Sequence, residues 1–325
     1  MSGNAKPTIF VTRRWPAVAE AELSKYFTPT FNREDAPLTT QQIAEGFADH
    51  DALAPTVSDA ITAEIIMAGV AGKRKLIANF GVGVNHIDIE ACKAASIPVS
   101  NTPGVLTDAT ADITMTLMLM LARRAGEGER ELRSGNWAGW HPTHLLGRQL
   151  SGKTLGIIGM GRIGKAVARR CALGFGMKVV FFNRSKVVNC DDIDAIQLGS
   201  VVDVCAAADF ISLHCAASPD TFEIINIAAF DAMRSDAVVI NTARGEVIDE
   251  TALIDALNKG SIGGAGLDVY QGEPDISAGL LTAPNTVLLP HLGSATLETR
   301  TAMGLKVVEN LRAFFASQPL LDPIG

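Results

Sequence analysis

Residues 153–164 read KTLGIIGMGRIG, an apolar run that ends in three glycines with G-x-G-x-x-G spacing. Lys153–Ile158 predicts a buried strand, and Lys165–Leu173 predicts a helix directly after the last glycine. In that setting the first two glycines allow a tight turn and close approach of a pyrophosphate, the third lets the helix touch the strand, and the helix N-terminus supplies amides. The segment predicts a dinucleotide-binding loop, with a purely structural glycine turn as the alternative. The residues expected to contact the cofactor here are Gly159, Gly161, Arg162, Ile163 and Gly164.

Strand-like and helix-like segments alternate on both sides of this loop. Before it, strands are predicted near residues 6–12, 50–53, 76–79 and 97–99, and helices near 17–27, 59–71 and 89–95. From the loop onward, six strands are predicted near residues 153–158, 179–182, 210–214, 237–241, 264–269 and 286–289. Such alternation predicts parallel sheets with helices on their faces, so the fold class is α/β. At 325 residues the chain exceeds the usual size of a single core, and two domains are expected.

Three further segments connect or extend the two series. Residues 107–124 are apolar almost all round, with Thr107 or Asp108 as N-cap, and predict a helix buried between domains. Residues 126–150 contain glycines and tryptophans without a clean period, which predicts an excursion that packs against a partner subunit. Residues 295–317 predict a final helix that returns the chain to the first domain.

The bulk composition excludes several classes of function. The chain is 47% hydrophobic and 19% charged, as expected of a compact globular protein. A net charge of −7 opposes binding to nucleic acid or to an anionic membrane, because both require a basic face. The five cysteines lack metal-site spacing and predict buried thiols in a reducing compartment. The first nine residues show no leader pattern, and the longest apolar run, Ile113–Ala122, is too short to span a bilayer, so a cytoplasmic protein is expected.

The segment after the second strand of the later series indicates which dinucleotide is bound. NAD enzymes place Asp or Glu there, where it binds the ribose 2′-hydroxyl. This chain has Asn183, Arg184 and Ser185 instead, which offer donors and a cation to a 2′-phosphate. NADP(H) is therefore the preferred cofactor. The alternative is that Arg184 is only a solvated charge and that NAD(H) is used as well.

Three downstream segments carry the residues suited to catalysis: NTARGE at 241–246, GEP at 272–274 and PHLGSAT at 290–296. Each follows a predicted strand, so their side chains should gather at the carboxyl edge of one sheet, where open α/β sheets bind ligands. Together with the loop at 159–164, GVGVNHID at 81–88, NTPGVLT at 101–107 and Asp268, they resemble the D-2-hydroxyacid dehydrogenase family, in particular its glyoxylate and hydroxypyruvate reductase branch. The resemblance covers nearly the whole chain.

The resemblance implies a catalytic set of Arg244, Glu273 and His291. His291 would give a proton to the keto oxygen of the substrate as hydride arrives from the nicotinamide, a role that suits imidazole near neutral pH. Glu273 would favour the protonated ring. Arg244 would bind the substrate carboxylate with its planar fork.

The resemblance assigns further residues to substrate and cofactor. The amides of Val82 and Gly83 would form a second clamp on the carboxylate, from the first domain, and Ser294 would lie in or next to the substrate site. The remaining residues expected at the cofactor are Thr107, Cys215, Thr221, Thr242, Ala243, Asp268 and Gly293. A cleft that closes over substrate, with hinges near 101–107 and 292–296, follows from such an arrangement.

The resemblance also sets the domain organisation. A doubly wound, Rossmann-like NADP(H)-binding domain, residues 102–294, would be inserted into a flavodoxin-like substrate domain made of residues 1–101 and 295–325. Residues 125–150 would form a dimerisation arm, and Trp140 would reach the substrate pocket of the neighbouring subunit in a homodimer. The alternative for Trp140 is that it anchors the arm by burial alone.

The other histidines suggest support rather than catalysis. His86 is expected to brace the turn after Gly83, and His214 ends a strand near the cofactor. His50, His141 and His144 show no ligand spacing, so no metal is expected. Cys215, next to His214, is a poor candidate for a nucleophile because it lies where family backbone atoms line the cofactor.

Three other functions share the scaffold. One is a dinucleotide-sensing regulator that resembles C-terminal binding proteins, and another is an NAD-linked dehydrogenase of a bulkier D-2-hydroxy acid. The third is formate or phosphite oxidation, which would favour NAD and so conflicts with Asn183 and Arg184.

Overall fold

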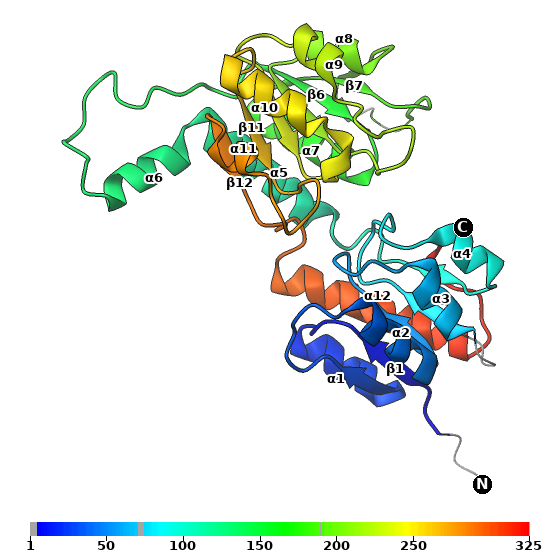
Figure 1. The fold of residues 1–325 in the computed structure, drawn as a ribbon. Helices are drawn as coiled ribbons and strands as arrows, with labels where there is room; N and C mark the ends of the chain where they lie inside the picture. Colours follow the sequence, from blue (N-terminus) through cyan, green and yellow to red (C-terminus); the bar gives the residue numbers. More distant parts are fainter. Residues whose placement is uncertain (1–4, 71–74, 189, 191, 325) are drawn as a thin grey trace. The chain divides into compact units, whose positions relative to one another are not determined.

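The computed structural model describes residues 5–70, 75–188, 190 and 192–324, and the chain divides into two compact units (Figure 1). Unit 1 comprises Met1–Leu106 and Ala295–Gly325, and unit 2 comprises Thr107–Ser294. The first boundary thus follows residue 106, whereas the sequence places it at 101. Residues 101 and 102 stay with unit 1 because the Asn101 amide donates to Asp322 O and the Thr102 amide to Gly81 O.

Unit 1 contains a six-stranded sheet in the order β13-β5-β4-β3-β1-β2. The strands are β1 (Thr8–Val11), β2 (Thr28–Phe31), β3 (Ala52–Ala54), β4 (Leu76–Ala78), β5 (Val99–Ser100) and β13 (Pro323–Ile324). All pair in parallel except β13, which lies antiparallel to β5. The order 2-1-3-4-5 is that of flavodoxin-like folds, which confirms the predicted class of this unit.

Five helices flank this sheet: α1 (Ala17–Tyr26), α2 (Thr40–Asp49), α3 (Ala63–Gly69), α4 (Ile89–Ala94) and α12 (Leu297–Phe315). Residues alternate between two buried clusters along the strands, so that Ala52 and Ala54 face one cluster and Leu53 the other. Helix α12 packs against α1 and β4, which confirms that the final helix returns to the first unit. Both faces of the sheet are therefore covered.

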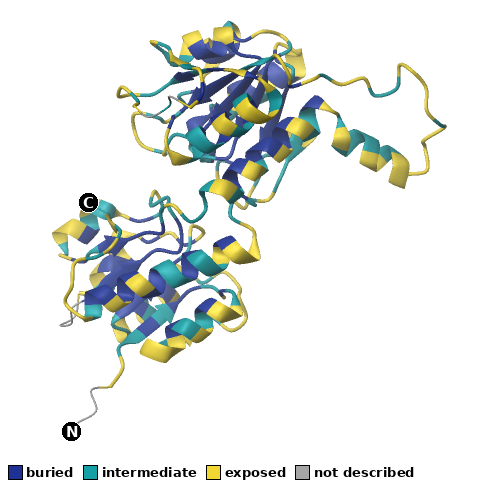
Figure 2. Cartoon of the chain, turned by 180° about the vertical axis from the view of Figure 1, so that it is seen from behind, coloured by how far each residue is buried: buried dark blue, intermediate teal, exposed yellow. Residues whose placement is uncertain are grey.

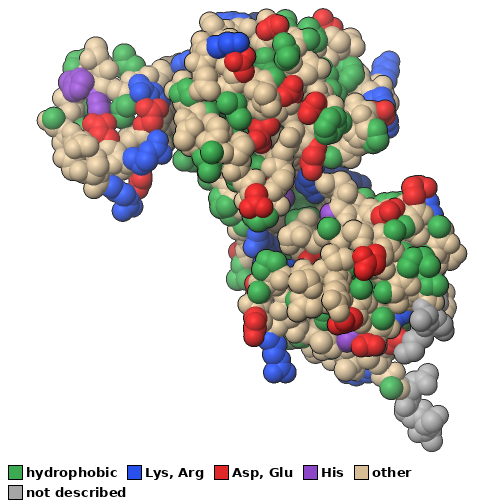
Figure 3. Space-filling view, in the orientation of Figure 1, with side chains coloured by type: hydrophobic (Ala, Val, Ile, Leu, Met, Phe, Trp, Pro, Cys, Tyr) green, Lys and Arg blue, Asp and Glu red, His purple; other side chains and the backbone are tan. Residues whose placement is uncertain are grey.

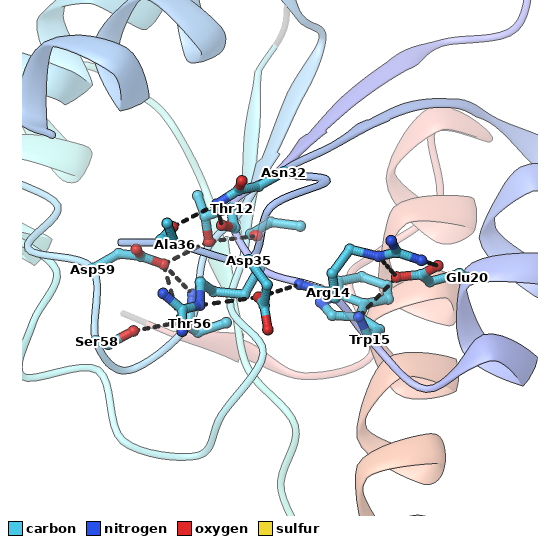
Figure 4. Close-up of polar contacts among 12 residues, drawn as sticks. Thr12, Arg14, Trp15, Glu20, Asn32, Asp35, Ala36, Thr56, Ser58 and Asp59 are labelled. Atoms are coloured by element: carbon cyan, nitrogen blue, oxygen red, sulfur yellow. Dashed lines mark hydrogen bonds and ion pairs between the residues drawn. The ribbon is translucent and has the colours of Figure 1, made fainter. Parts of the chain in front are cut away.

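Polar contacts fix the loops at the carboxyl ends of β1, β2 and β3 (Figure 4). Oδ2 of the buried Asp59 accepts from the Thr12 hydroxyl at 2.6 Å and from the Thr56 amide at 2.7 Å. Asn32 donates to Thr12 O at 2.9 Å, and Arg14 forms a two-pronged pair with Glu20. These contacts are internal to unit 1 and give its sheet edge a fixed shape.

Unit 2 contains a seven-stranded parallel sheet in the order β12-β11-β10-β9-β6-β7-β8. The strands are β6 (Thr154–Ile158), β7 (Lys178–Phe182), β8 (Ala195–Gln197), β9 (Phe210–Leu213), β10 (Val238–Asn241), β11 (Gly264–Leu267) and β12 (Thr286–Leu288). Starting from β6 the order is 3-2-1-4-5-6-7, the doubly wound dinucleotide-binding arrangement with one added strand. The six predicted strands are present, and β8 was not predicted.

The helices of unit 2 cover both faces of its sheet (Figure 1). They are α5 (Thr107–Ala122), α6 (Ala125–Arg133), α7 (Arg162–Arg169), α8 (Val201–Ala207), α9 (Ile227–Ala232), α10 (Glu250–Lys259) and α11 (Ala278–Thr282), with a π-helical turn at Arg170–Gly174 and a 3-10 turn at Gly245–Val247. Among the described residues no helix is long and apolar enough to cross a membrane.

Helix α5 is not buried on all sides, contrary to the sequence-based prediction. It packs on α7 and on β10, β11 and β12 within unit 2, with Leu117 and Met118 buried. Asp112 and Thr116 are exposed on its other side, as is 36% of Leu119. It also begins at Thr107 itself, so Thr107 and Asp108 lie within its first turn.

The segment after α5 forms an arm that projects from the body of unit 2 (Figures 1 and 2). The predicted arm, residues 125–150, extends too far, because the Arg148 amide donates to Ala122 O and Leu150 is buried in unit 2. The first part of the arm is helix α6, which the sequence did not predict. None of the residues of α6 is buried. Ion pairs between Arg124 and Glu127 and between Arg133 and Glu129 accompany it. Helix α6 has these ion pairs and no buried apolar face, so a search for apolar periodicity could not have predicted it.

Candidate functional site

The glycine loop follows β6, between the ends of β7 and β9, where the strand order reverses. Gly159 has φ +96°, and a Cβ there would lie 2.6 Å from the Cys215 amide nitrogen. A Cβ at Gly164 would lie 2.4 Å from Gly159 O. These two glycines are therefore required by the fold itself.

Gly161 differs from its two neighbours in the motif. A Cβ at this position would have no atom within 4 Å, and its φ of −80° suits any residue. Gly161 is also the N-cap of α7 and gives no side-chain cap, so the first amides of α7 can meet a ligand. The protein does not require glycine here, but a pyrophosphate that approaches the backbone would. The loop thus fits a dinucleotide.

Asn183, Arg184 and Ser185 follow β7, on one side of this loop. Asn183 Nδ2 donates to Ser185 O at 3.0 Å, and Gln197 Nε2 donates to the carbonyls of both residues at 3.1 Å. Arg184 Nη1 lies 3.2 Å from Oδ2 of Asp220, which follows β9. Because β6 lies between β7 and β9, this exposed ion pair joins the two sides of the glycine loop. Asp220 was not predicted, since it lies 36 residues away in sequence.

The three catalytic candidates follow three adjacent strands, β10, β11 and β12. After β10, Asn241 shapes the turn that carries Arg244: its Oδ1 accepts from the Ala243 amide at 3.0 Å, and its Nδ2 donates to Arg244 O at 2.7 Å. Arg244 Nη1 donates to Ala243 O at 2.7 Å. Burial lowers the pKa of the Arg244 guanidinium, and the charges of Glu246 and Glu273 oppose that effect. An arginine stays protonated under such a shift.

His291 and Glu273 form a hydrogen-bonded pair. His291 Nδ1 lies 2.7 Å from Glu273 Oε2, and the Tyr270 amide donates to Glu273 Oε1 at 2.9 Å. Burial alone would raise the pKa of Glu273. The hydrogen bonds from His291 and the Tyr270 amide, with the charges of His291 and Arg244, outweigh it and lower that pKa. Glu273 is therefore a carboxylate at neutral pH.

Asp268 holds the backbone that follows His291. The residue is 1% exposed, and its two oxygens accept from the amides of Leu292 at 2.6 Å and Gly293 at 2.7 Å. Burial raises the pKa of Asp268, although these amides and His291 oppose the rise. His291 itself has φ +55°, a left-handed conformation that is rare for such a residue. The clamp on the next two amides stabilises that conformation.

Threonines link α5 to the catalytic loops. Thr114 Oγ1 lies 3.0 Å from Thr242 Oγ1, and Thr110 Oγ1 donates to Gly293 O at 3.2 Å. All three threonines are buried. Thr242 and Gly293, predicted as cofactor contacts, are thus also fixed to α5.

The other predicted residues are distributed over both units. In the 216–221 loop Thr221 Oγ1 donates to Ala216 O at 2.7 Å, and Cys215 lies against Gly159. Ser294 is the last residue of unit 2, and Trp140 lies on the arm, 81% exposed. In unit 1, Asn79 Nδ2 donates to the carbonyls of Gly81 and Gly83 at 3.1 and 3.0 Å.

His86 braces the loop at Val82 and Gly83, as predicted. Its Nε2 lies 3.0 Å from Asn79 Oδ1, and Asn101 donates to Val82 O at 2.8 Å. Across the described part of the chain, the amides of Val82 and Gly83 have no hydrogen-bond partner. With their carbonyls held and their amides unpaired, both residues can donate to an anion.

The cysteines are less uniformly buried than predicted. Cys92, Cys171 and Cys205 are buried, but Cys190 and Cys215 are only half-buried, because both lie in loops beyond strand ends. Burial nevertheless raises the pKa of the Cys215 thiol to about 11. A thiol that stays protonated at neutral pH is a weak nucleophile. Among the residues that the structure describes, no group of three or more His, Cys, Asp or Glu side chains could hold a metal ion.

Comparison with known proteins establishes the family. Residues 115–293 match the model of the D-isomer specific 2-hydroxyacid dehydrogenase NAD-binding domain. The chain belongs to the D-isomer specific 2-hydroxyacid dehydrogenase family. It is therefore an NAD(P)-dependent oxidoreductase, and the matched range falls within unit 2.

Relatives of the 2-hydroxyacid dehydrogenase family match over nearly the whole chain. Glyoxylate reductase of Thermococcus litoralis is 41% identical over 95% of this chain and 94% of its own length. Glycerate dehydrogenase of Hyphomicrobium methylovorum is 36% identical over 96% of this chain and 97% of its own length. The structure of an NADPH-dependent glyoxylate/hydroxypyruvate reductase from Sinorhizobium meliloti, with NADP and malonate, has a TM-score of 0.86 at 33% identity, covering 99% and 97% of the two chains.

Proposed function

We propose that this dehydrogenase is an NADPH-dependent reductase of a small 2-keto acid of the glyoxylate or hydroxypyruvate type, and that it forms the D-2-hydroxy acid. The observation that carries the proposal is the 2.7 Å pair of His291 Nδ1 and Glu273 Oε2, one strand away from the turn that carries Arg244. A proton donor and a guanidinium at one sheet edge are the groups that a keto acid needs. The named activities of the relatives support the substrate class.

The residues of the chain divide the reaction among them. Glu273 accepts a hydrogen bond from Nδ1–H of His291, which orients the ring and leaves Nε2 to hold the proton that the keto oxygen takes up. Arg244 binds the substrate carboxylate. When bound, the reduced nicotinamide supplies a hydride to the keto carbon. Hydride and proton together would convert the carbonyl to a hydroxyl. Nδ1 of His291 would stay paired with Glu273 while Nε2 gives up its proton.

The cofactor would lie along the glycine loop, with its pyrophosphate at Gly161, Arg162 and Ile163. Asn183, Arg184 and Ser185 favour a 2′-phosphate, since they present donors and a cation where a carboxylate would repel it. The exposed Asp220 pairs with Arg184 only weakly, because solvent screens such pairs. A 2′-phosphate can therefore take its place. NAD(H) stays a possible second cofactor of the same site.

Further predicted contacts stay proposals. Val82 and Gly83 would donate their amides to the substrate carboxylate, and the lack of a partner for these amides among the described residues supports this. The remaining proposed contacts are Ser294 for substrate and Gly159, Gly164, Thr107, Cys215, Thr221, Thr242, Ala243, Asp268 and Gly293 for cofactor.

A homodimer formed through the arm is also proposed. The arm exposes 62% of Leu132, 50% of Trp137, 81% of Trp140 and 65% of Leu146. Figure 3 shows it as a lobe separate from the body of unit 2. Large apolar side chains exposed together mark an interaction surface, and a second copy of the chain is the proposed occupant. Sedimentation of the protein and of a Trp137→Ala/Leu146→Ala variant tests this: dimer for the first and monomer for the second are expected, and a monomeric parent protein would refute it.

The decisive experiment measures loss of 340 nm absorbance with glyoxylate or hydroxypyruvate and either NADPH or NADH, beside a His291→Ala variant. Turnover with NADPH that collapses in the variant is the expected result. Turnover with NADH and larger 2-keto acids alone would indicate the NAD-linked dehydrogenase of bulkier substrates. Tight dinucleotide binding without turnover would favour a sensor of the C-terminal binding protein type.

A further inference from the structure

Tyr270 makes contacts on both sides of the His291–Glu273 pair. Its backbone amide donates to Glu273 Oε1 at 2.9 Å. Its hydroxyl lies 2.8 Å from Leu289 O and 3.1 Å from Leu267 O. One residue therefore contacts the carboxylate directly and also the segment that leads into His291.

The carbonyl of Leu289 is where these contacts converge. It accepts from the Tyr270 hydroxyl and also from the His291 amide, at 3.1 Å. The Leu289 amide in turn donates to Leu267 O at 2.8 Å, the second carbonyl that the phenol reaches. The hydroxyl thus joins the ends of β11 and β12 at the residue that sets the position of His291. The left-handed φ of +55° at His291 makes that position depend on the surrounding contacts.

The phenol is suited to a permanent contact of this kind. Tyr270 is 8% exposed, so water does not compete for its hydroxyl. Burial raises the pKa of the Tyr270 phenol, with added contributions from the charges of Asp268 and Glu273. The phenol is therefore a neutral hydrogen-bond donor at neutral pH.

We propose that Tyr270 is a positioning residue of the reaction, which sets the distance between Glu273 and His291 through its amide on one side and its hydroxyl on the other. The inference rests on the proposed function of that pair. The ring of Tyr270 faces the core. Tyr270 would therefore act only by holding Glu273 and His291 in position.

Tyr270→Phe tests the proposal, because it removes one oxygen and keeps the ring in place. The chain has two tyrosines, and Tyr26→Phe, on α1 of unit 1, is the matched control. The expected result is a loss of roughly ten-fold in kcat, below the range for losing a general acid outright. The KM and Kd for NADPH should not change, and the pH below which activity is lost should move higher, because a loosened pair lowers the pKa of Glu273 less. The control should equal the parent enzyme.

A double variant separates positioning from general stability. If Tyr270 acts through Glu273, Tyr270→Phe added to Glu273→Gln costs little beyond Glu273→Gln alone. A purely structural role predicts that the two losses multiply, and that result would overturn the proposal. So would a Tyr270→Phe enzyme with unchanged kcat and pH profile, provided that His291→Ala is inactive. An active His291→Ala enzyme would instead refute the proposed function itself.

A spectroscopic measurement keeps the proposal testable if the variant fails to fold. In a Tyr26→Phe background labelled with 3-fluorotyrosine, Tyr270 gives the single ¹⁹F resonance of the protein. Contact with the pair predicts that this resonance shifts with pH, and that Glu273→Gln abolishes the dependence. A resonance that does not respond to pH in the folded enzyme would contradict the inference.

Discussion

His291 Nδ1 lies 2.7 Å from Glu273 Oε2, and the two side chains are 32% and 33% exposed. The residues follow two neighbouring strands, β12 and β11, so the sheet itself brings them together. The pairing leaves Nε2 as the ring nitrogen that can meet a substrate. It also means that the ionised carboxylate and the protonated ring stabilise one another.

Replacement of Glu273 by Gln should lower kcat by about 100-fold, at the low end of general acid catalysis, because a neutral amide no longer favours the protonated ring. The lowered pKa of Glu273 means that its carboxylate form is lost only as the pH falls well below neutrality. Activity of the parent enzyme should therefore decline at low pH through this group, and the variant should lack that limb. Profiles of kcat/KM against pH measure both effects, with Glu298→Gln on α12 as control. An unchanged profile would count against the pair.

Arg244→Lys should raise the KM for the keto acid by about ten- to 100-fold, since an ammonium cannot reproduce a two-pronged contact with a carboxylate. The Kd of NADPH should stay within a factor of about two, a shift below RT in free energy. Steady-state kinetics and fluorescence titration give the two numbers. Arg312→Lys, on α12, is the matched control. Equal weakening of substrate and cofactor binding would show that Arg244 supports the loop instead.

Asn183→Asp should reverse the cofactor preference, because a carboxylate after β7 repels a 2′-phosphate and binds a ribose hydroxyl. The KM for NADPH should rise about ten-fold or more while that for NADH falls. Asp220→Asn should lower the KM for NADPH, because it releases Arg184 and removes a nearby negative charge. Asn258→Asp, exposed on α10, controls for added surface charge. If neither variant changes the ratio of the two KM values, this segment does not select the cofactor.

The parts of the fold that the sequence predicted are those held by side-chain burial. The six strands of unit 2 that were predicted are apolar runs, and β6, β9, β10 and β11 are almost wholly buried. The missed strands β2, β8 and β13 have no buried residues. These strands are held by backbone hydrogen bonds at the edges of the sheets. The pattern of apolar side chains in the sequence gives no sign of such pairing. Helix α2 could have been found, since Thr39 and Gln42 form a capping box.

The site divides in a similar way. Arg244, Glu273 and His291 were singled out because their motifs carry the chemistry, and strand order then explains why they meet. Tyr270, Asp220 and Asn79 could not be identified, because each acts through a contact that only the folded chain creates. A tyrosine before Glu273 resembles any core aromatic until its hydroxyl is seen at Leu289 O. Motifs in the sequence thus indicate candidate reacting groups more readily than the groups that position them.

Stability should depend on pH through His214. Burial lowers the pKa of this imidazole to about 3, and its Nδ1 has no partner among the described residues. As the pH falls below about 6.5, His214 binds a proton in the unfolded chain but not in the folded chain. The free energy of unfolding therefore decreases below about pH 6.5. One such group contributes about 1.4 kcal/mol per pH unit. Urea unfolding of the protein and of His214→Gln between pH 7.5 and 5 should show a shallower slope in the variant, with the exposed His141→Gln as control. Parallel slopes would contradict the prediction.

The glycines of the motif should separate folding from binding. At Gly164 an added methyl group would lie 2.4 Å from Gly159 O, so Gly164→Ala should lower the free energy of unfolding by about 1–3 kcal/mol. At Gly161 the same methyl group meets no protein atom within 4 Å, and Gly161→Ala should fold as the parent does. Gly161→Ala should affect cofactor binding alone. The Kd for NADPH should rise at least about ten-fold, because the backbone can no longer approach a pyrophosphate closely. Urea unfolding and fluorescence titration of both variants measure the two effects. A Gly161→Ala protein that binds NADPH normally would count against close approach of a pyrophosphate to this residue, and its role as N-cap of α7 would then account for the glycine.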